Sequence, residues 1–154
     1  MTPVILSGGE NMNDVFKMNV VSLLCAVMAW IPLELMLNVY RISRWTPWEI
    51  ETVTMWMIAA TAVVVAGGTT GLYLLSKRWL HGRKANAWIT ILWIPYLVLF
   101  VYVVASLFPI TYRGDMPNPV TGLLAMGGGV IYPIYIFFVQ LAADAYRSEG
   151  NIQE

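Results

Sequence analysis

Charged residues are scarce in this chain of 154 residues: Asp, Glu, Lys and Arg make up 12%, and hydrophobic residues make up 58%. Soluble domains usually contain about 25% charged residues. The chain therefore has too little charge to cover a surface that faces water. Its nine basic and nine acidic side chains also cancel, so the overall charge gives no reason to expect nucleic acid as a partner.

Cysteine and histidine each occur once, as Cys25 and His81. One cysteine excludes an intramolecular disulfide framework, a metal site built of several thiolates and a CxxC redox pair. One histidine leaves little for a haem or a His-based metal centre. The sequence also lacks a Ser/His/Asp arrangement, an HExxH motif and two carboxylates on one face of an apolar run. We therefore predict no catalytic residue, no metal ion and no cofactor.

Four long apolar runs dominate the rest of the sequence, at about 18–40, 52–76, 86–112 and 119–143. A helix needs about 20 residues to cross the hydrocarbon of a bilayer. The runs are too long for buried strands and show no strict alternation of a barrel. The sequence predicts an all-α integral membrane protein, a bundle of four transmembrane helices over 18–143. Short tails at 1–17 and 144–154 flank it.

Basic residues are distributed unevenly between the two sides of this bundle. One side holds six of them and the other holds three. Since basic residues favour the cytoplasmic side, we expect both termini in the cytoplasm, in a prokaryotic plasma (inner) membrane. The six are Lys17, Lys77, Arg78, Arg83, Lys84 and Arg147; the three are Arg41, Arg44 and Arg113.

The two halves of the chain resemble each other. Trp30-Ile31-Pro32 in the first run recurs as Trp93-Ile94-Pro95 in the third, and glycine-rich segments near Gly67 and Gly127 recur in the even runs. Two helices per unit would make this a direct repeat of two helical hairpins. Chance similarity between short apolar segments is the alternative.

Glu34 is the one acidic residue deep inside a run, in the segment WIPLELMLNVY. Asn38 and Arg41 follow at spacings of four and three, which places all three on one helical face. Pro32 favours a kink just before Glu34. Glu34 could be protonated, paired with Arg41 or another basic group, or exposed to a water-filled cavity. Its role is either structural, as a hydrogen-bonded helix contact or a carboxylate that reaches the outer headgroups, or functional, in binding a cation or exchanging a proton.

Small residues in the second and fourth runs indicate close helix packing, because glycine lets backbones approach each other within lipid. A sharper alternative is a hinge in the fourth run at Pro133, which cannot donate an amide to the carbonyl of Gly129. The candidate packing and hinge residues are Gly67, Gly68, Gly71, Gly127, Gly128, Gly129 and Pro133.

The loop between the second and third runs, KRWLHGRK, contains four basic residues: Lys77, Arg78, Arg83 and Lys84. They could contact anionic lipid headgroups. Their role in orienting the protein is a sufficient alternative explanation. The next loop contains Arg-Gly-Asp, a tripeptide too common to indicate adhesion.

Taken together, these features predict a non-catalytic subunit, scaffold or assembly factor of a membrane complex. We expect the lipid bilayer, other copies of the chain or other membrane subunits as its partners, and no nucleic acid. The main alternative is a homo-oligomeric transporter or channel coupled to protons or cations through Glu34. A lipid-modifying membrane enzyme is a weaker alternative.

Overall fold

The computed structural model describes residues 12–79 and 83–150, and within them the side chains of 14–79 and 88–146. The elements are α1 (Met12–Leu37), α2 (Val39–Trp45), α3 (Ile50–Trp79), α4 (Arg83–Leu107), the short 3-10 helix η1 (Arg113–Asp115) and α5 (Pro119–Gly150). The described residues contain no strand, and the predicted all-α fold is confirmed. Residues 1–11 of the expected first tail and His81 lie outside this part of the chain.

Four of these helices are long and apolar enough to cross a membrane: Asp14–Leu37, Ile50–Trp79, Trp88–Leu107 and Pro119–Tyr146. The protein is accordingly an integral membrane protein, as its composition predicts. Within the described residues the spans contain 24, 30, 20 and 28 residues, and about 20 suffice to cross the hydrocarbon.

The ends of the helices differ from the expected ends of the runs for local reasons. Helix α1 begins six residues early, and Lys17 forms an ion pair with Asp14 in its first turn, at 3.2 Å. Helix α4 ends at Leu107, before the apolar run does. Pro109 follows two residues later, and a proline disfavours helical backbone at the residue that precedes it. Helix α5 continues through Pro133 to Gly150, so the hinge stays a prediction.

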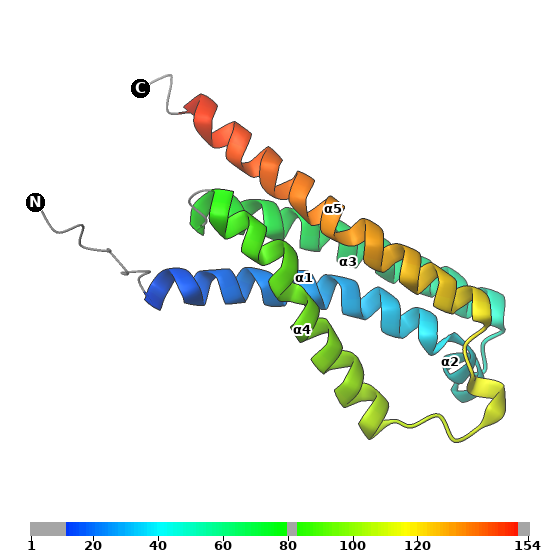
Figure 1. Cartoon of the computed structure of the whole chain (residues 1–154). Helices are drawn as coiled ribbons and strands as arrows, with labels where there is room; N and C mark the ends of the chain where they lie inside the picture. Colours follow the sequence, from blue (N-terminus) through cyan, green and yellow to red (C-terminus); the bar gives the residue numbers. More distant parts are fainter. Residues whose placement is uncertain (1–11, 80–82, 151–154) are drawn as a thin grey trace, which may run out of the picture.

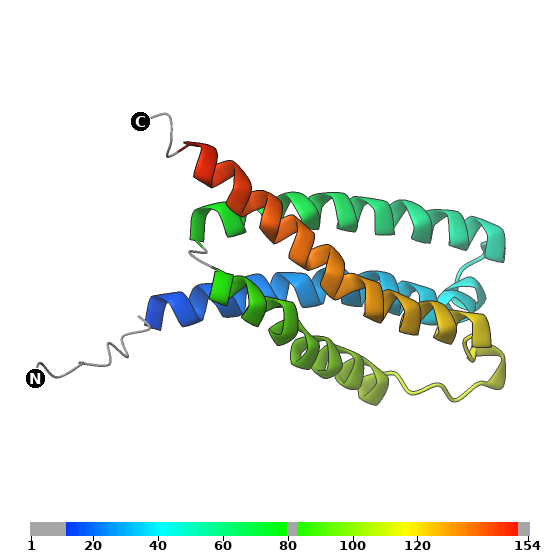
Figure 2. The same ribbon diagram turned by 45° about the horizontal axis from the view of Figure 1, so that its top comes forward.

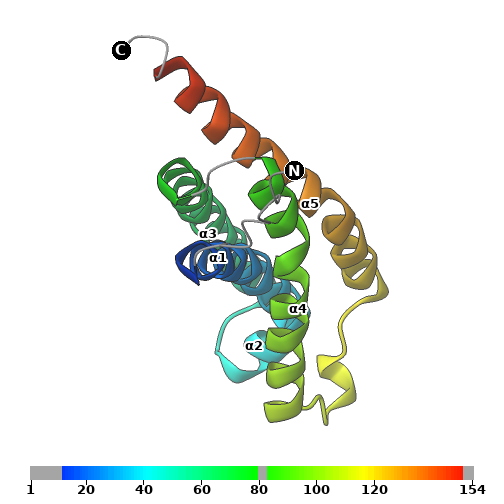
Figure 3. The same cartoon turned by 60° about the vertical axis from the view of Figure 1, so that its left-hand side comes forward.

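Helix α1 lies between α3 and α4 and packs along both, while α5 packs mainly along α3 (Figures 1 and 2). The start of α1 and the end of α5 lie at one end of the bundle, which we call the N/C end. Helix α2 and η1 lie at the other end, which we call the α2 end (Figure 3).

The buried core lies towards the N/C end, where small residues let the helices approach closely. Its members are Val21, Cys25 and Ala26 of α1, Leu72 of α3, Ile89 and Trp93 of α4, and Ile136 of α5. A Cβ at Gly68 would overlap the side chain of Met28, and one at Gly71 would lie 3.4 Å from Leu24. These two glycines therefore set the close contact between α3 and α1.

Candidate functional site

Glu34 is bonded to its own helix rather than to a basic residue. The side-chain amide of Asn38 donates to Glu34 Oε2 at 3.0 Å and to the Glu34 carbonyl oxygen at 2.9 Å. The Asn38 backbone N–H donates to the same carbonyl at 3.0 Å. Asparagine competes for helical backbone in this way, and the boundary between α1 and α2 falls at Asn38, whose φ is −106° and ψ 12°. Helix α1 continues through Pro32, so the kink stays a prediction, and the local departure from helix lies at Asn38.

The residue one turn before Glu34 contacts α4. This residue, Trp30, has its ring centroid 5.5 Å from that of Phe100 in α4. Among the residues that the structure describes, no cation lies within ion-pair distance of Glu34. The structure therefore does not contain the ion pair between Glu34 and Arg41 that the sequence allowed.

Arg41 pairs with a different carboxylate, that of Asp115 in η1. The Arg41 Nε lies 3.9 Å from Asp115 Oδ2, and its Nη1 donates to the Phe108 carbonyl at 3.1 Å. Both side chains are buried, with exposed fractions of 9% and 4%. A buried charge is tolerated when it is paired and hydrogen-bonded, so Asp115 accounts for the burial of Arg41.

Arg44 binds the same carboxylate through two hydrogen bonds. Its Nε donates to Asp115 Oδ1 at 2.9 Å and its Nη2 to Oδ2 at 2.5 Å, and its guanidinium lies over the Tyr112 ring at 4.9 Å. This hydrogen bonding with Asp115 raises the pKa of Arg44 above its usual value. We call Arg41, Arg44 and Asp115 the Asp115 clasp. It ties α2 to η1 at the α2 end.

Asp115 was not predicted as a site residue, because it lies in the common tripeptide Arg-Gly-Asp. A usable signal was present, however. Arg41 and Arg44 are three apart in one loop region, and Asp115 is the acidic residue of the other loop on the same predicted side of the membrane.

The candidate packing glycines fall into two groups. Gly68 and Gly71 face α1, as described above. A Cβ built on Gly67, Gly127, Gly128 or Gly129 would meet nothing within 4 Å. These four positions therefore have no packing role within the described part of the chain.

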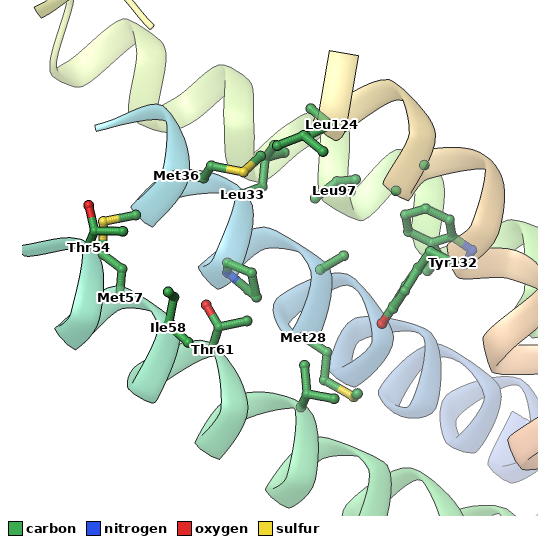
Figure 4. A pocket seen from close by; sticks show the side chains of 17 residues that line it. Met28, Leu33, Met36, Thr54, Met57, Ile58, Thr61, Leu97, Leu124 and Tyr132 are labelled. Atoms are coloured by element: carbon green, nitrogen blue, oxygen red, sulfur yellow. The ribbon is translucent and has the colours of Figure 1, made fainter. Parts of the chain in front are cut away.

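An apolar cleft of about 540 Å³ lies in the half of the bundle nearer the α2 end. It is lined by residues of α1, α3, α4 and α5, and Figure 4 shows Leu33, Ile58 and Leu124 around it. Gly128 and Gly129 line it on the α5 side. Their lack of side chains is part of what makes the space.

Towards the N/C end, three buried polar side chains have no hydrogen-bond partner among the described residues. Ser76 and Gln140 each lie one turn beyond a core residue, Leu72 and Ile136, and Ser22 lies one turn before Ala26 on the antiparallel α1. None of their side-chain N or O atoms makes a hydrogen bond within the structure. These three residues were not predicted from the sequence, although polar residues at a spacing of four from buried ones would have indicated them.

The candidate lipid-binding residues lie at the same end. Lys77 lies over the Tyr146 ring at 3.9 Å, and Arg78 is exposed. Arg83 and Lys84 begin α4, but their side chains lie outside the described part of the chain. In that part, no group of three Cys, His, Asp or Glu side chains could hold a metal ion.

No family model matches the chain, and no curated protein or solved structure matches it. The proposals below therefore depend on the residues and their geometry alone.

Proposed function

We propose that the protein is a non-catalytic subunit, scaffold or assembly factor of a membrane complex, and that it binds a partner helix through the outer face of α5. We define this face by Leu123, Met126, Gly127, Val130 and Ile134. These side chains are exposed, Met126 to 73%, and they share one side of the helix at spacings of three and four.

Gly127 is the observation that carries the proposal. Glycine in a helix costs about 1 kcal/mol relative to alanine, and a Cβ at Gly127 would meet nothing within 4 Å. The chain itself therefore gains no packing from this glycine. A partner helix that approaches the α5 backbone closely would gain from it, because close van der Waals contact is what holds helices together in lipid.

The test is a pair of substitutions at glycines that both have open space. In Gly127→Leu the new side chain projects from the outer face, whereas Gly122→Leu adds the same side chain on a flank of α5, and its Cβ also meets nothing within 4 Å. Energy transfer between labelled copies in liposomes measures self-association, and co-purification from the native membrane measures other subunits. We expect Gly127→Leu to weaken one of these at least about tenfold and Gly122→Leu to leave both unchanged. Equal behaviour of the two variants in both assays would refute the proposal.

One observation favours transport as a second candidate function. Glu34 is held by Asn38 and, within the described residues, has no cation as a partner. Intramembrane carboxylates commonly mark ion or proton pathways. The protein would then be a homo-oligomeric transporter or channel coupled to protons or cations.

Infrared difference spectroscopy of the carboxylate in reconstituted protein tests this candidate, with Glu34→Gln as the control. A carboxyl band that is absent from Glu34→Gln, titrates near neutral pH and responds to a cation would support transport. A carboxylate band that stays in the ionised form and does not change with any cation would mean that Glu34 is a structural hydrogen-bond acceptor.

We further propose that both termini face the cytoplasm of a prokaryotic cell, in its plasma membrane. The excess of basic residues at the N/C end supports this orientation. Reporter fusions at the C-terminus and in the loop before α5 test it, since the two should report opposite sides.

A further inference from the structure

The cleft between α3 and α5 has the size of a small-molecule site. Its volume of about 540 Å³ falls within the roughly 300–1,000 Å³ that such sites occupy. It opens within the apolar part of the bundle, so its occupant must come from the membrane or be soluble in it.

Two of the hydroxyl groups that line the cleft are already engaged as donors. The Thr54 hydroxyl donates to the Ile50 carbonyl at 2.7 Å, and the Tyr132 hydroxyl donates to the Cys25 carbonyl at 2.6 Å. Thr61 supplies the third hydroxyl of the lining, so a ligand that needs a hydroxyl donor from the protein has only this side chain beside the two that are engaged.

Acceptors, in contrast, are left over by the prolines. Pro133 has no amide hydrogen, so the carbonyl of Gly129 lacks the usual helical donor four residues on. Likewise, Pro32 leaves the carbonyl of Met28 without its usual helical donor. Gly129, Met28 and Pro32 all line the cleft. At Gly129 the surface is the backbone itself, since glycine has no side chain to cover it.

We propose that the cleft binds a long-chain alcohol dissolved in the membrane, with its hydrocarbon chain along Leu33, Ile58 and Leu97 and its hydroxyl donating to the carbonyl of Gly129. The apolar lining of the cleft suits the hydrocarbon chain of the alcohol. The Gly129 carbonyl, which lacks its helical donor, suits the hydroxyl of the alcohol. An unpaired carbonyl in a medium without water gains from a donor that the ligand brings. The site uses the inner side of α5 and does not depend on the outer face.

The experiment is photolabelling of the intact protein in liposomes with a diazirine-bearing long-chain alcohol, followed by peptide mapping. Hexadecanol and hexadecane serve as competitors, because they differ only in the hydroxyl. We expect label on the cleft residues of α1 and α3, and hexadecanol to compete about tenfold better than hexadecane, as one hydrogen bond predicts.

A matched pair of variants locates the site. Gly128→Leu fills the cleft and Gly122→Leu adds the same side chain outside it, and neither new Cβ meets an atom within 4 Å. We expect label in the cleft to fall at least about fivefold in Gly128→Leu and to persist in Gly122→Leu. Circular dichroism confirms that both variants remain folded.

Three results would overturn the proposal. Label spread evenly over the lipid-facing helices, or equal label in the two variants, would mean that the cleft is not a site. Equal competition by the alkane would mean that an acyl chain fills the cleft and that the Gly129 carbonyl does not select an alcohol.

Discussion

Removing the negative charge of Asp115 tests whether the Asp115 clasp stabilises the bundle. Asp115→Asn keeps the size of the side chain and one oxygen acceptor but leaves both arginines without a counter-charge. Arg44 is 46% exposed, so water can replace much of what it loses. Arg41 is 9% exposed, and Asp115 is its ion-pair partner in the described structure. The cost should therefore come mainly from Arg41.

The size of the effect follows from that burial. Leaving one partner of a buried ion pair uncompensated costs about 3–5 kcal/mol. Arg41 keeps its hydrogen bond to the Phe108 carbonyl, so we expect the lower end, a loss of about 3 kcal/mol in the free energy of unfolding. Glu49→Gln removes the same charge from an exposed side chain near the same end, and should cost less than about 0.5 kcal/mol.

Unfolding of the purified protein by increasing SDS in mixed micelles, followed by circular dichroism, measures both variants. The raised pKa of Arg44 also predicts how its contribution to stability depends on pH. A group whose pKa is raised on folding stabilises the fold fully below its unfolded pKa and loses this effect only as pH rises through the folded value. The contribution of Arg44 should therefore not change through the neutral range. If Asp115→Asn costs no more than Glu49→Gln, the clasp does not hold the bundle together.

Two further pairs of contacts give predictions for the same unfolding assay. Gly68→Ala should destabilise the bundle by about 1 kcal/mol, because its Cβ would overlap the flexible Met28 side chain, which must move. Gly67→Ala should be neutral or slightly stabilising, since its Cβ meets nothing within 4 Å. Equal effects would contradict the packing described for α3 and α1. Tyr132→Phe should cost about 1 kcal/mol through the loss of its 2.6 Å bond to the Cys25 carbonyl, and an unchanged midpoint would show that this bond adds nothing.

The number of membrane-spanning helices could be predicted because lipid imposes them, whereas the short helices α2 and η1 were not predicted. Runs of about 20 apolar residues leave helices as the main way to satisfy the backbone. The ends of the helices were harder to predict, since they depend on single residues. Pro109 shortens α4, and Asp14 with Lys17 extends α1 towards the N-terminus.

The site could be predicted only in part. The spacing of Glu34, Asn38 and Arg41 placed them on one face, but which carboxylate Arg41 reaches depends on how two distant loops meet. The two groups of glycines show the same limit. Gly67 and Gly68 are neighbours in the sequence, yet only Gly68 faces Met28, because rotation about the helix axis separates them. The cleft arises from the crossing of four helices, which no local pattern contains.

The Asp115 clasp also bears on the order in which the protein is assembled. Arg44 and Asp115 are 71 residues apart, and synthesis proceeds from the N-terminus. While the first two spans are being inserted, both arginines lack this carboxylate and gain more from water than from a dry interior. They can be buried against Asp115 only after α4 and η1 have been synthesised. The α2 end of the first hairpin therefore stays hydrated until the second hairpin packs against it. A chain truncated before Asp115 would expose two arginines without this carboxylate to any quality-control machinery that recognises them.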